Sequence, residues 1–387
     1  MNLINKLLRK IMKFTIEKSI FIKLLSNVCN VASKKNQNNP AILQNIKIEA
    51  KNGVVFLTGT DSDTYIKNNS KATVENDGAT TVSAQLIYDI VKKMEDGAEI
   101  TCEYVKDENN FYIKSGKSKF KLMCLEVDGY PNFEEQEMPI EFKITAQHFI
   151  NIIDKTRLSI SDDPSRYYLN GLFIQTVNED DGLKLCGVST DGHRLSIIKL
   201  NEYLGKEPVT GVIIPKKALP EIKKVLCGVP EEDINVFLSK TKIKFETANT
   251  ILISKLIDAE FPDYNRVVPR ENNKVLKADK KLLTSIIDRV STVASDGHRG
   301  IKFILSENKL ILESNSAENG SASEDIVVDF AYTDGIEIGF NSKFILDIFS
   351  QIDSDNVNIY FKDNSSAILV KGEEESGNIF VLMPIRI

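Results

Sequence analysis

The chain repeats one pattern three times, and this triplication constrains its fold more than any single motif. Three segments open alike, with a short alternating strand that runs into an amphipathic helix, and they begin at Phe14, Phe142 and Leu276. A second strand-and-helix segment recurs from Thr80, Gly211 and Glu337. The units end in similar strings, YPNF at 130–133, FPDY at 261–264 and LMPIRI at 382–387. Corresponding positions lie about 130 residues apart, which is typical of tandem copies of one domain.

The copies account for almost all of the 387 residues. We expect domains at 12–137, 138–271 and 272–387, with 1–11 as an extension outside the repeat. The extension carries three basic residues among Leu and Ile, so a targeting segment is one interpretation. An upstream start codon or a frayed end is the other, and it is favoured because no cleavage site follows.

The composition is that of a soluble protein with real cores, since 42% of residues are hydrophobic and 27% charged. Charged or amide residues interrupt every apolar run before it reaches the roughly 18 residues that a membrane span needs. The five cysteines are scattered without a paired motif, which favours buried, reduced thiols in a cytoplasmic protein. We therefore expect no membrane, metal or cofactor.

Each copy is expected to run strands, helix, strands, helix, strands. In the first copy, alternating segments are separated by turn signals at Asn52-Gly53, Asp77-Gly78 and Ser115-Gly116. Such a pattern predicts an α+β domain with an antiparallel sheet and two helices on one face.

Charge adds a clue to function. The net charge is −6, but Lys and Arg gather on the expected helices, for example at Lys92, Lys93, Lys223 and Lys224. Distributed cations without a base-reading motif suit sequence-independent contact with phosphates. The alternative is a set of ordinary solvated helix faces.

Four strings then carry a family resemblance: YYLNG at 167–171, STDGHRL at 189–195, SKLIDAEFPDYNRVVP at 254–269 and the terminal MPIRI. In this order they resemble the bacterial DNA polymerase III beta sliding clamp, over residues 12–387. The resemblance implies three clamp domains per chain, with sheets outside and two helices per domain inside, in a ring-shaped homodimer. It implies a processivity factor of DNA replication that encircles double-stranded DNA and tethers the replicative polymerase. Such a subunit has no catalysis of its own, although it is grouped with DNA-directed DNA polymerases, which are nucleotidyltransferases.

The resemblance also implies a cleft for short linear peptides of the polymerase alpha subunit, the clamp loader, other polymerases and repair proteins. The residues that match the cleft are Leu169, Thr190, Gly192, His193, Arg194, Leu195, Pro262, Arg266, Val267, Phe344, Met383, Pro384, Ile385, Arg386 and Ile387. Phe344 stands where Tyr is common in the family.

Candidate DNA contacts and dimer contacts follow in the same way. The DNA candidates are Lys34, Lys35, Lys92, Tyr167, Tyr168, Lys216 and Lys217. Tyr168 is equally well interpreted as an aromatic at the rim of the core. Two acids, Asp162 and Asp163, precede YYLNG where less acidic residues occur in relatives. The dimer candidates are Phe120 and Leu122 on an edge strand, with Thr292 and Val293 opposite.

Two other classes of protein remain open. The string DGHR at 191–194 has the residue types of a phosphodiester hydrolase, but the three histidines form no metal-binding pattern and a second DGHR at 296–299 falls elsewhere in the repeat. A peptide-binding scaffold that forms no ring is the second alternative.

Overall fold

The computed structural model describes residues 11–32, 40–132, 137–180, 182–201, 203–295, 299–373, 375 and 377–386. Three of the candidate residues, Lys34, Lys35 and Ile387, lie outside these ranges, as do residues 1–10 of the expected extension.

All six expected strand-and-helix segments form. The first segment of each copy consists of β1 (Ile11–Glu17) with α1 (Lys18–Cys29), β10 (Ile140–Thr145) with α3 (Ala146–Thr156), and β19 (Lys274–Asp279) with α5 (Lys280–Ser291). The second consists of β6 (Gly78–Ser83) with α2 (Ala84–Lys92), β15 (Val212–Pro215) with α4 (Leu219–Leu226), and β23 (Ile336–Asn341) with α6 (Ser342–Phe349).

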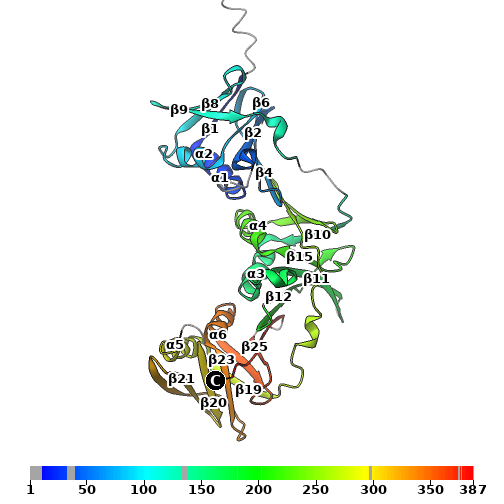
Figure 1. The fold of residues 1–387 in the computed structure, drawn as a ribbon. Helices are drawn as coiled ribbons and strands as arrows, with labels where there is room; N and C mark the ends of the chain where they lie inside the picture. The colour runs from blue at the N-terminus through cyan, green and yellow to red at the C-terminus, as the bar shows by residue number, and fades with distance from the viewer. Residues whose placement is uncertain are drawn as a thin grey trace, which may run out of the picture. The chain divides into compact units, whose positions relative to one another are not determined.

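The helices form where an apolar stripe and a polar start coincide. In α1 the stripe is Phe21, Leu24, Leu25 and Val28, all buried. The helix lies against β3 and β4 with α2 beside it (Figure 1). Polar caps start two later helices: the Asp279 carboxylate accepts a hydrogen bond from Leu282 N, and the Asn341 side chain accepts one from Lys343 N.

The remaining strands complete antiparallel sheets, as predicted for an α+β protein. They are β2 (Asn45–Lys51), β3 (Val54–Thr60), β4 (Thr64–Lys71), β5 (Thr73–Asn76), β7 (Glu99–Val105), β8 (Asn110–Ser115), β9 (Ser118–Leu125), β11 (Gly171–Glu179), β12 (Gly182–Thr190), β13 (Arg194–Lys199), β14 (Leu204–Gly205), β16 (Asp233–Leu238), β17 (Lys242–Glu246), β18 (Thr250–Lys255), β20 (Gly300–Ser306), β21 (Lys309–Ser316), β22 (Gly320–Val327), β24 (Asn356–Phe361), β25 (Ile368–Gly372) and β26 (Asn378–Leu382). The predicted turn at Asn52-Gly53 joins β2 to β3 with both residues at positive φ, 50° and 78°.

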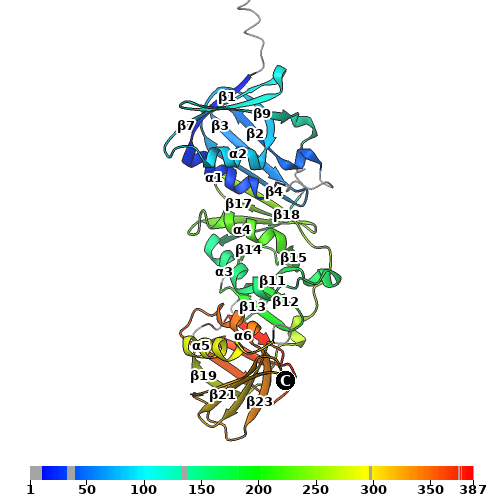
Figure 2. The same ribbon diagram turned by 60° about the vertical axis from the view of Figure 1, so that its left-hand side comes forward.

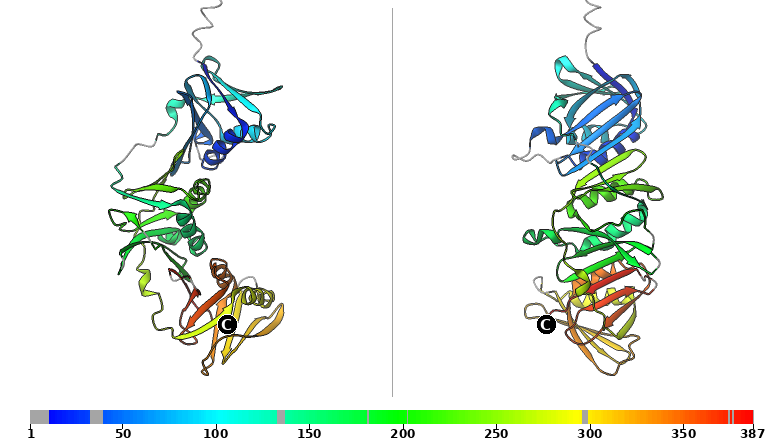
Figure 3. Two further views of the ribbon diagram at one scale, coloured as in Figure 1. Left: turned by 180° about the vertical axis from the view of Figure 1, so that it is seen from behind. Right: turned by 90° about the vertical axis from the view of Figure 1, so that its right-hand side faces the viewer.

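Strand pairing crosses from one copy to the next. In the first compact unit β18 of the second copy pairs with β4 of the first, with Leu252 opposite Ile66, and this joins fourteen strands in one sheet (Figure 2). In the second unit β26 of the third copy pairs with β13 of the second, with Phe380 opposite Ser196, in a sheet of eight strands (Figure 3). Strands β20 to β23 form a separate sheet of four.

Because strands of neighbouring copies pair in this way, the three copies form two compact units rather than three. One unit holds 1–147, 205–207 and 217–256, and the other holds 148–204, 208–216 and 257–387. The middle copy contributes β10, β16, β17 and β18 to the first unit and β11, β12, β13 and β15 to the second.

The cysteine prediction is partly wrong. All five cysteines are free, and Cys102, Cys124 and Cys186 are buried. Cys227 is exposed, because it lies at the C-terminal cap of α4 rather than on its apolar stripe, and Cys29 is half-buried. Within the described ranges, no three Cys, His, Asp or Glu side chains gather as a metal site requires, and no helix is long and apolar enough to cross a membrane.

The contact of α1 with β3 predicts the effect of one substitution. A Cβ atom on Gly59 would lie 2.3 Å from the carbonyl oxygen of Val28, so backbone would have to shift. We expect Gly59→Ala to destabilise the protein by about 1–3 kcal/mol, the usual effect of overpacking, and to lower the first thermal transition. Gly129→Ala is the control, because nothing lies within 4 Å of its Cβ position. Equal melting of both variants would contradict the close contact.

A buried lysine in the second unit predicts a dependence on pH. Lys155 Nζ donates to Glu375 Oε2 at 2.9 Å and to the Gln351 carbonyl, which ties α3 to the end of α6. Burial opposes ionisation of Glu375, but hydrogen bonds from Lys155 and Asn378 outweigh it and hold the pKa of Glu375 below its usual 4.5.

A lowered pKa means that the stabilisation is complete above about pH 4.5 and is lost as pH falls through the lower, folded-state pKa. Glu375→Gln should therefore melt at a lower temperature than the unchanged chain at neutral pH, with the gap closing in acid. Melting curves at a series of pH values measure this gap. A gap that stays constant into acid would show that the carboxylate charge contributes nothing.

Candidate functional site

The loop between β12 and β13 is held by its own side chains. The Asp191 Oδ1 accepts from His193 N at 2.9 Å and from Arg194 N at 3.0 Å. Thr190 Oγ1 donates to the Arg194 carbonyl and accepts from Gly192 N. Gly192 has φ 88°, a conformation that disfavours a side chain. The order TDGHR thus encodes a rigid turn that presents His193 to solvent.

Arg194 is buried, and its guanidinium contacts two carboxylates and an aromatic ring. Its Nε donates to Asp191 Oδ2 at 3.1 Å and its Nη1 to Asp347 Oδ2 at 2.6 Å, from α6. Its Cζ lies 4.3 Å from the centroid of the Phe344 ring, and that ring stacks on His193 at 6.2 Å. The guanidinium therefore locks the loop to α6. Both oxygens of the Asp191 carboxylate accept hydrogen bonds within this arrangement, which argues against a role for Asp191 as the general acid or base of a hydrolase.

An apolar floor lies beside the turn. Leu169, Leu195, Phe261, Tyr264 and Val381 belong to one buried cluster, against which Tyr168, Val268 and Ala367 pack. The Tyr264 hydroxyl accepts from Gln175 Nε2 at 2.6 Å, so its polar end is satisfied. Burial raises the pKa of Tyr264, which keeps the hydroxyl neutral.

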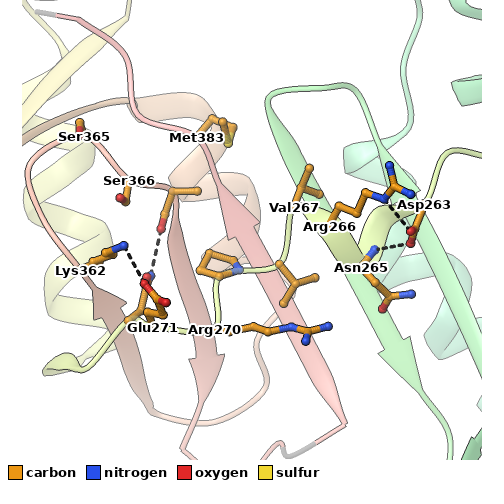
Figure 4. A pocket seen from close by; sticks show the side chains of 14 residues that line it. Asp263, Asn265, Arg266, Val267, Arg270, Glu271, Lys362, Ser365, Ser366 and Met383 are labelled. Carbon is orange, nitrogen blue, oxygen red and sulfur yellow. Dashed lines mark hydrogen bonds and ion pairs between the residues drawn. The ribbon is translucent and has the colours of Figure 1, made fainter.

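A cavity of about 770 Å³ opens along the segment 263–272 (Figure 4). The predicted cleft residues Arg266, Val267 and Met383 line it. Two ion pairs flank it, Arg266 Nε with Asp263 Oδ2 at 3.0 Å and Lys362 Nζ with Glu271 Oε2 at 2.8 Å.

Sequence reasoning missed part of this lining. The missed residues are Asp263, Asn265, Val268, Pro269, Arg270, Glu271, Asn272, Lys362 and Ser366, and Ser365 and Ala367 also line the cavity. The string KDNSSA at 362–367 carries a turn signal, but its place beside 263–272 follows from the pairing of β19 with β24, far apart in sequence.

The C-terminal residues divide between two places. Met383 N donates to the His193 carbonyl at 2.8 Å, which fixes the chain end beside the turn, and Pro384 is half-buried. Ile385 N donates to the Gly339 carbonyl, and Ile385 and Arg386 line a separate cavity of about 420 Å³. Pro262 is exposed next to the floor residue Phe261.

The DNA candidates lie in different surroundings. Tyr167 is 55% exposed, whereas Tyr168 is half-buried against the apolar floor. Lys92 is exposed at the end of α2, with its Nζ 5.9 Å from the Tyr88 ring centroid. Lys216 and Lys217 each form an ion pair with a carboxylate, Asp162 for the first and Asp63 for the second.

The dimer candidates lie in β9 and just after α5. Phe120 is 37% exposed, whereas Leu122 is buried within its own unit. Thr292 is exposed and donates to the Asp288 carbonyl at 3.1 Å, and Val293 is half-buried.

Three family models match in succession. The descriptions are DNA polymerase III beta subunit, N-terminal domain, at 12–134, central domain at 143–263, and C-terminal domain at 265–386. Among curated relatives, the beta sliding clamp of Caulobacter vibrioides NA1000 is 35% identical over 97% of this chain and 100% of its own, and that of Escherichia coli K12 is 30% identical with the same coverage.

Solved structures agree. A sliding clamp from Bartonella birtlesii, crystallised with griselimycin, superposes with a TM-score of 0.91 at 36% identity, covering 97% of this chain and 100% of that one. The polymerase III beta subunit of Caulobacter crescentus gives 0.90 at 34% identity, with the same coverage. This chain therefore belongs to the DNA polymerase III beta subunit family, the beta sliding clamps, which are non-catalytic subunits of the polymerase III holoenzyme.

Proposed function

We propose that two copies of this chain close head to tail into a ring in the cytoplasm, that double-stranded DNA runs through the ring, and that the replicative polymerase, the clamp loader and other partners dock by short peptides. The domain boundaries expected after residues 137 and 271 are part of this proposal. The observation that carries it is the repeated strand pairing between copies.

The pairing obeys one rule at both junctions. Each copy ends in a closing strand, which is β9, β18 or β26. At or just after the end of this strand, the chain pairs with the strand before the second helix, as Leu125 does with Thr81 and Ile257 with Ile213. Strands β4, β13 and β22 also correspond, because each is the second strand of the equivalent hairpin. The junctions are β4 with β18 and β13 with β26, so the rule leaves β22 and β9 for a second chain.

Both remaining edges are open among the residues that the structure describes. Strand β22 pairs only with β21, and β9 pairs with β6 only at Cys124 and Leu125, which leaves Ser118–Met123 with one free edge. Val327 on β22 is 85% exposed and Met123 on β9 is 86% exposed. Open edges that carry exposed apolar side chains invite strand addition.

Phe120 supports this pairing in particular. Phe120 precedes the bridged residue Leu125 by the same number of residues as Leu252 in β18 precedes Ile257 and Phe380 in β26 precedes Ile385. Leu252 and Phe380 are therefore its counterparts. Both counterparts are fully buried by their junctions, whereas Phe120 is 37% exposed. A second chain on β9 would bury it in the same way. Leu122 is already buried, so it supports the edge from the core side rather than by direct contact.

The cleft suits an extended peptide with apolar anchors. Its floor is apolar, its rim carries His193 and the exposed Arg266, and the neighbouring cavity of about 770 Å³ is of the size that small ligands occupy. The griselimycin complex of the Bartonella clamp is consistent with a ligand site on this fold.

Topology provides the test of the ring. Protein loaded by its clamp loader on nicked circular DNA should stay bound at high salt, because salt weakens phosphate contacts but does not open a ring. Cutting the circle should release it. Equal loss from circles and linear DNA would contradict encirclement and would favour the peptide-binding scaffold instead.

The cleft predicts a second result. Asp347→Asn removes the charge that faces Arg194 from α6 and should loosen the turn that carries His193. We expect a short fluorescent peptide with Leu and Phe anchors to bind several-fold more weakly, a loss on the order of 1 kcal/mol. Fluorescence polarisation measures this affinity. The control is Glu337→Gln, which breaks the exposed pair with Lys302 at 2.6 Å. If both variants bind the peptide with equal affinity and melt at the temperature of the unchanged chain, the contact of Arg194 with Asp347 does not contribute to peptide binding.

A further inference from the structure

One of the lysines proposed to meet phosphate already holds a carboxylate in the second unit. Lys216 Nζ lies 2.6 Å from Asp162 Oδ1, and the Asp162 side chain is 84% exposed. In the part of the chain that the structure describes, this contact is the only hydrogen bond or ion pair of the Asp162 carboxylate. Asp162 therefore neutralises Lys216 without a visible role in holding the fold.

The neighbouring Asp163 differs, although the sequence shows the two acids as a pair. Its Oδ1 accepts from Ser165 N at 2.9 Å and caps the short helix at Pro164–Leu169, while its Oδ2 accepts from Arg166 Nε at 2.9 Å. A hydrogen bond from the Ser165 hydroxyl, together with those from Ser165 N and Arg166, lowers the pKa of Asp163. Asp163 thus shapes the turn that leads into YYLNG, and Asp162 is free to act on Lys216.

The same arrangement occurs independently in the first unit. Lys217 Nζ contacts Asp63 Oδ2 and lies 3.8 Å from Asp61 Oδ2. Lys255 also contacts Asp63, at 3.1 Å. Hydrogen bonds from Lys217 and Lys255 lower the pKa of Asp63, so its carboxylate stays charged at neutral pH. Two lysines adjacent in sequence, one in each unit, therefore both face internal anions.

Lys92 provides the contrast. It is exposed beside Tyr88, and no carboxylate lies within 4 Å of its ammonium among the described residues. Among the candidate lysines that the structure describes, Lys216 and Lys217 before α4 therefore face internal anions and Lys92 does not.

We propose that the Asp162 and Asp63 carboxylates compete with DNA phosphates for Lys216 and Lys217. This competition lowers the affinity of the clamp for duplex DNA. The inference rests on the proposed function. A lysine that exchanges one oxyanion for another gains little from each phosphate it meets, because its charge is neutralised before and after the exchange. Contacts of this kind favour movement along DNA over tight binding.

The experiment compares Asp162→Asn with the unchanged chain and with Glu179→Gln. Glu179 pairs with Lys199 at 2.6 Å on another surface and serves as the matched acid-to-amide control. Fluorescence anisotropy with a labelled linear duplex, over a series of salt concentrations, measures affinity without the clamp loader. Lys216→Gln, alone and combined with Asp162→Asn, completes a double-mutant cycle.

Asp162→Asn should bind duplex more tightly at low salt and show one extra phosphate contact in its salt dependence. The ratio of its duplex affinity to that of the unchanged chain should then fall about 3.5-fold when the salt concentration rises about four-fold, as expected for one additional phosphate contact. The advantage should vanish in the Lys216→Gln background. Asp63→Asn frees both Lys217 and Lys255, so it should also tighten binding, and the part of its gain that comes from Lys217 should vanish in a Lys217→Gln background.

Two results would overturn the inference. Affinity equal to that of Glu179→Gln would show that the acid does not compete with DNA. The same gain with and without Lys216 would show simple repulsion between the acid and phosphate rather than competition for a lysine. Neither result bears on retention on circular DNA, which tests the ring separately.

Discussion

Backbone hydrogen bonding between copies of the repeat is the constraint on which the rest of this structure depends. A sheet edge leaves N–H and C=O groups without partners, and three copies of one domain supply matching edges. The pairs β4 with β18 and β13 with β26 satisfy two of these matches and produce continuous sheets across copy boundaries. The edges of β9 and β22 remain open among the described residues, and the proposed assembly of two chains would satisfy them in the same way.

The cleft depends on one of these junctions. Because β26 pairs with β13, the chain end leaves the sheet beside the turn that carries His193, and Met383 N donates to the His193 carbonyl. Arg194 then links this turn to α6 through Asp347. The proposed peptide site is therefore built from residues of the second and third copies, which the Arg194 guanidinium links. At the equivalent junction of the first copy, Thr64 lies opposite Ser254, where Arg194 lies opposite Leu382 in the second copy, so the first copy lacks this arginine.

The sequence predicted the six strand-and-helix segments, because the helical stripes and polar starts are local signals. It also predicted the family. It named Thr190, Gly192, His193, Arg194 and Leu195 as cleft candidates but did not predict the turn that they share. It did not predict that Asp191 and Asp347 share Arg194, or that Lys362 and Glu271 flank the cavity, because these contacts join segments far apart in sequence. The sequence also did not predict that Asp162 and Asp63 pair with Lys216 and Lys217, because the partners come together only in the folded chain.

The most direct test of edge pairing is an electron cryomicroscopy structure of the purified protein at a resolution that traces strands. The repeated rule predicts a closed ring of two chains in which β9 of each chain pairs with β22 of the other and Phe120 is buried. A monomer, or a dimer joined through any other surface, would contradict the claim that one strand-pairing rule builds both the chain and its assembly.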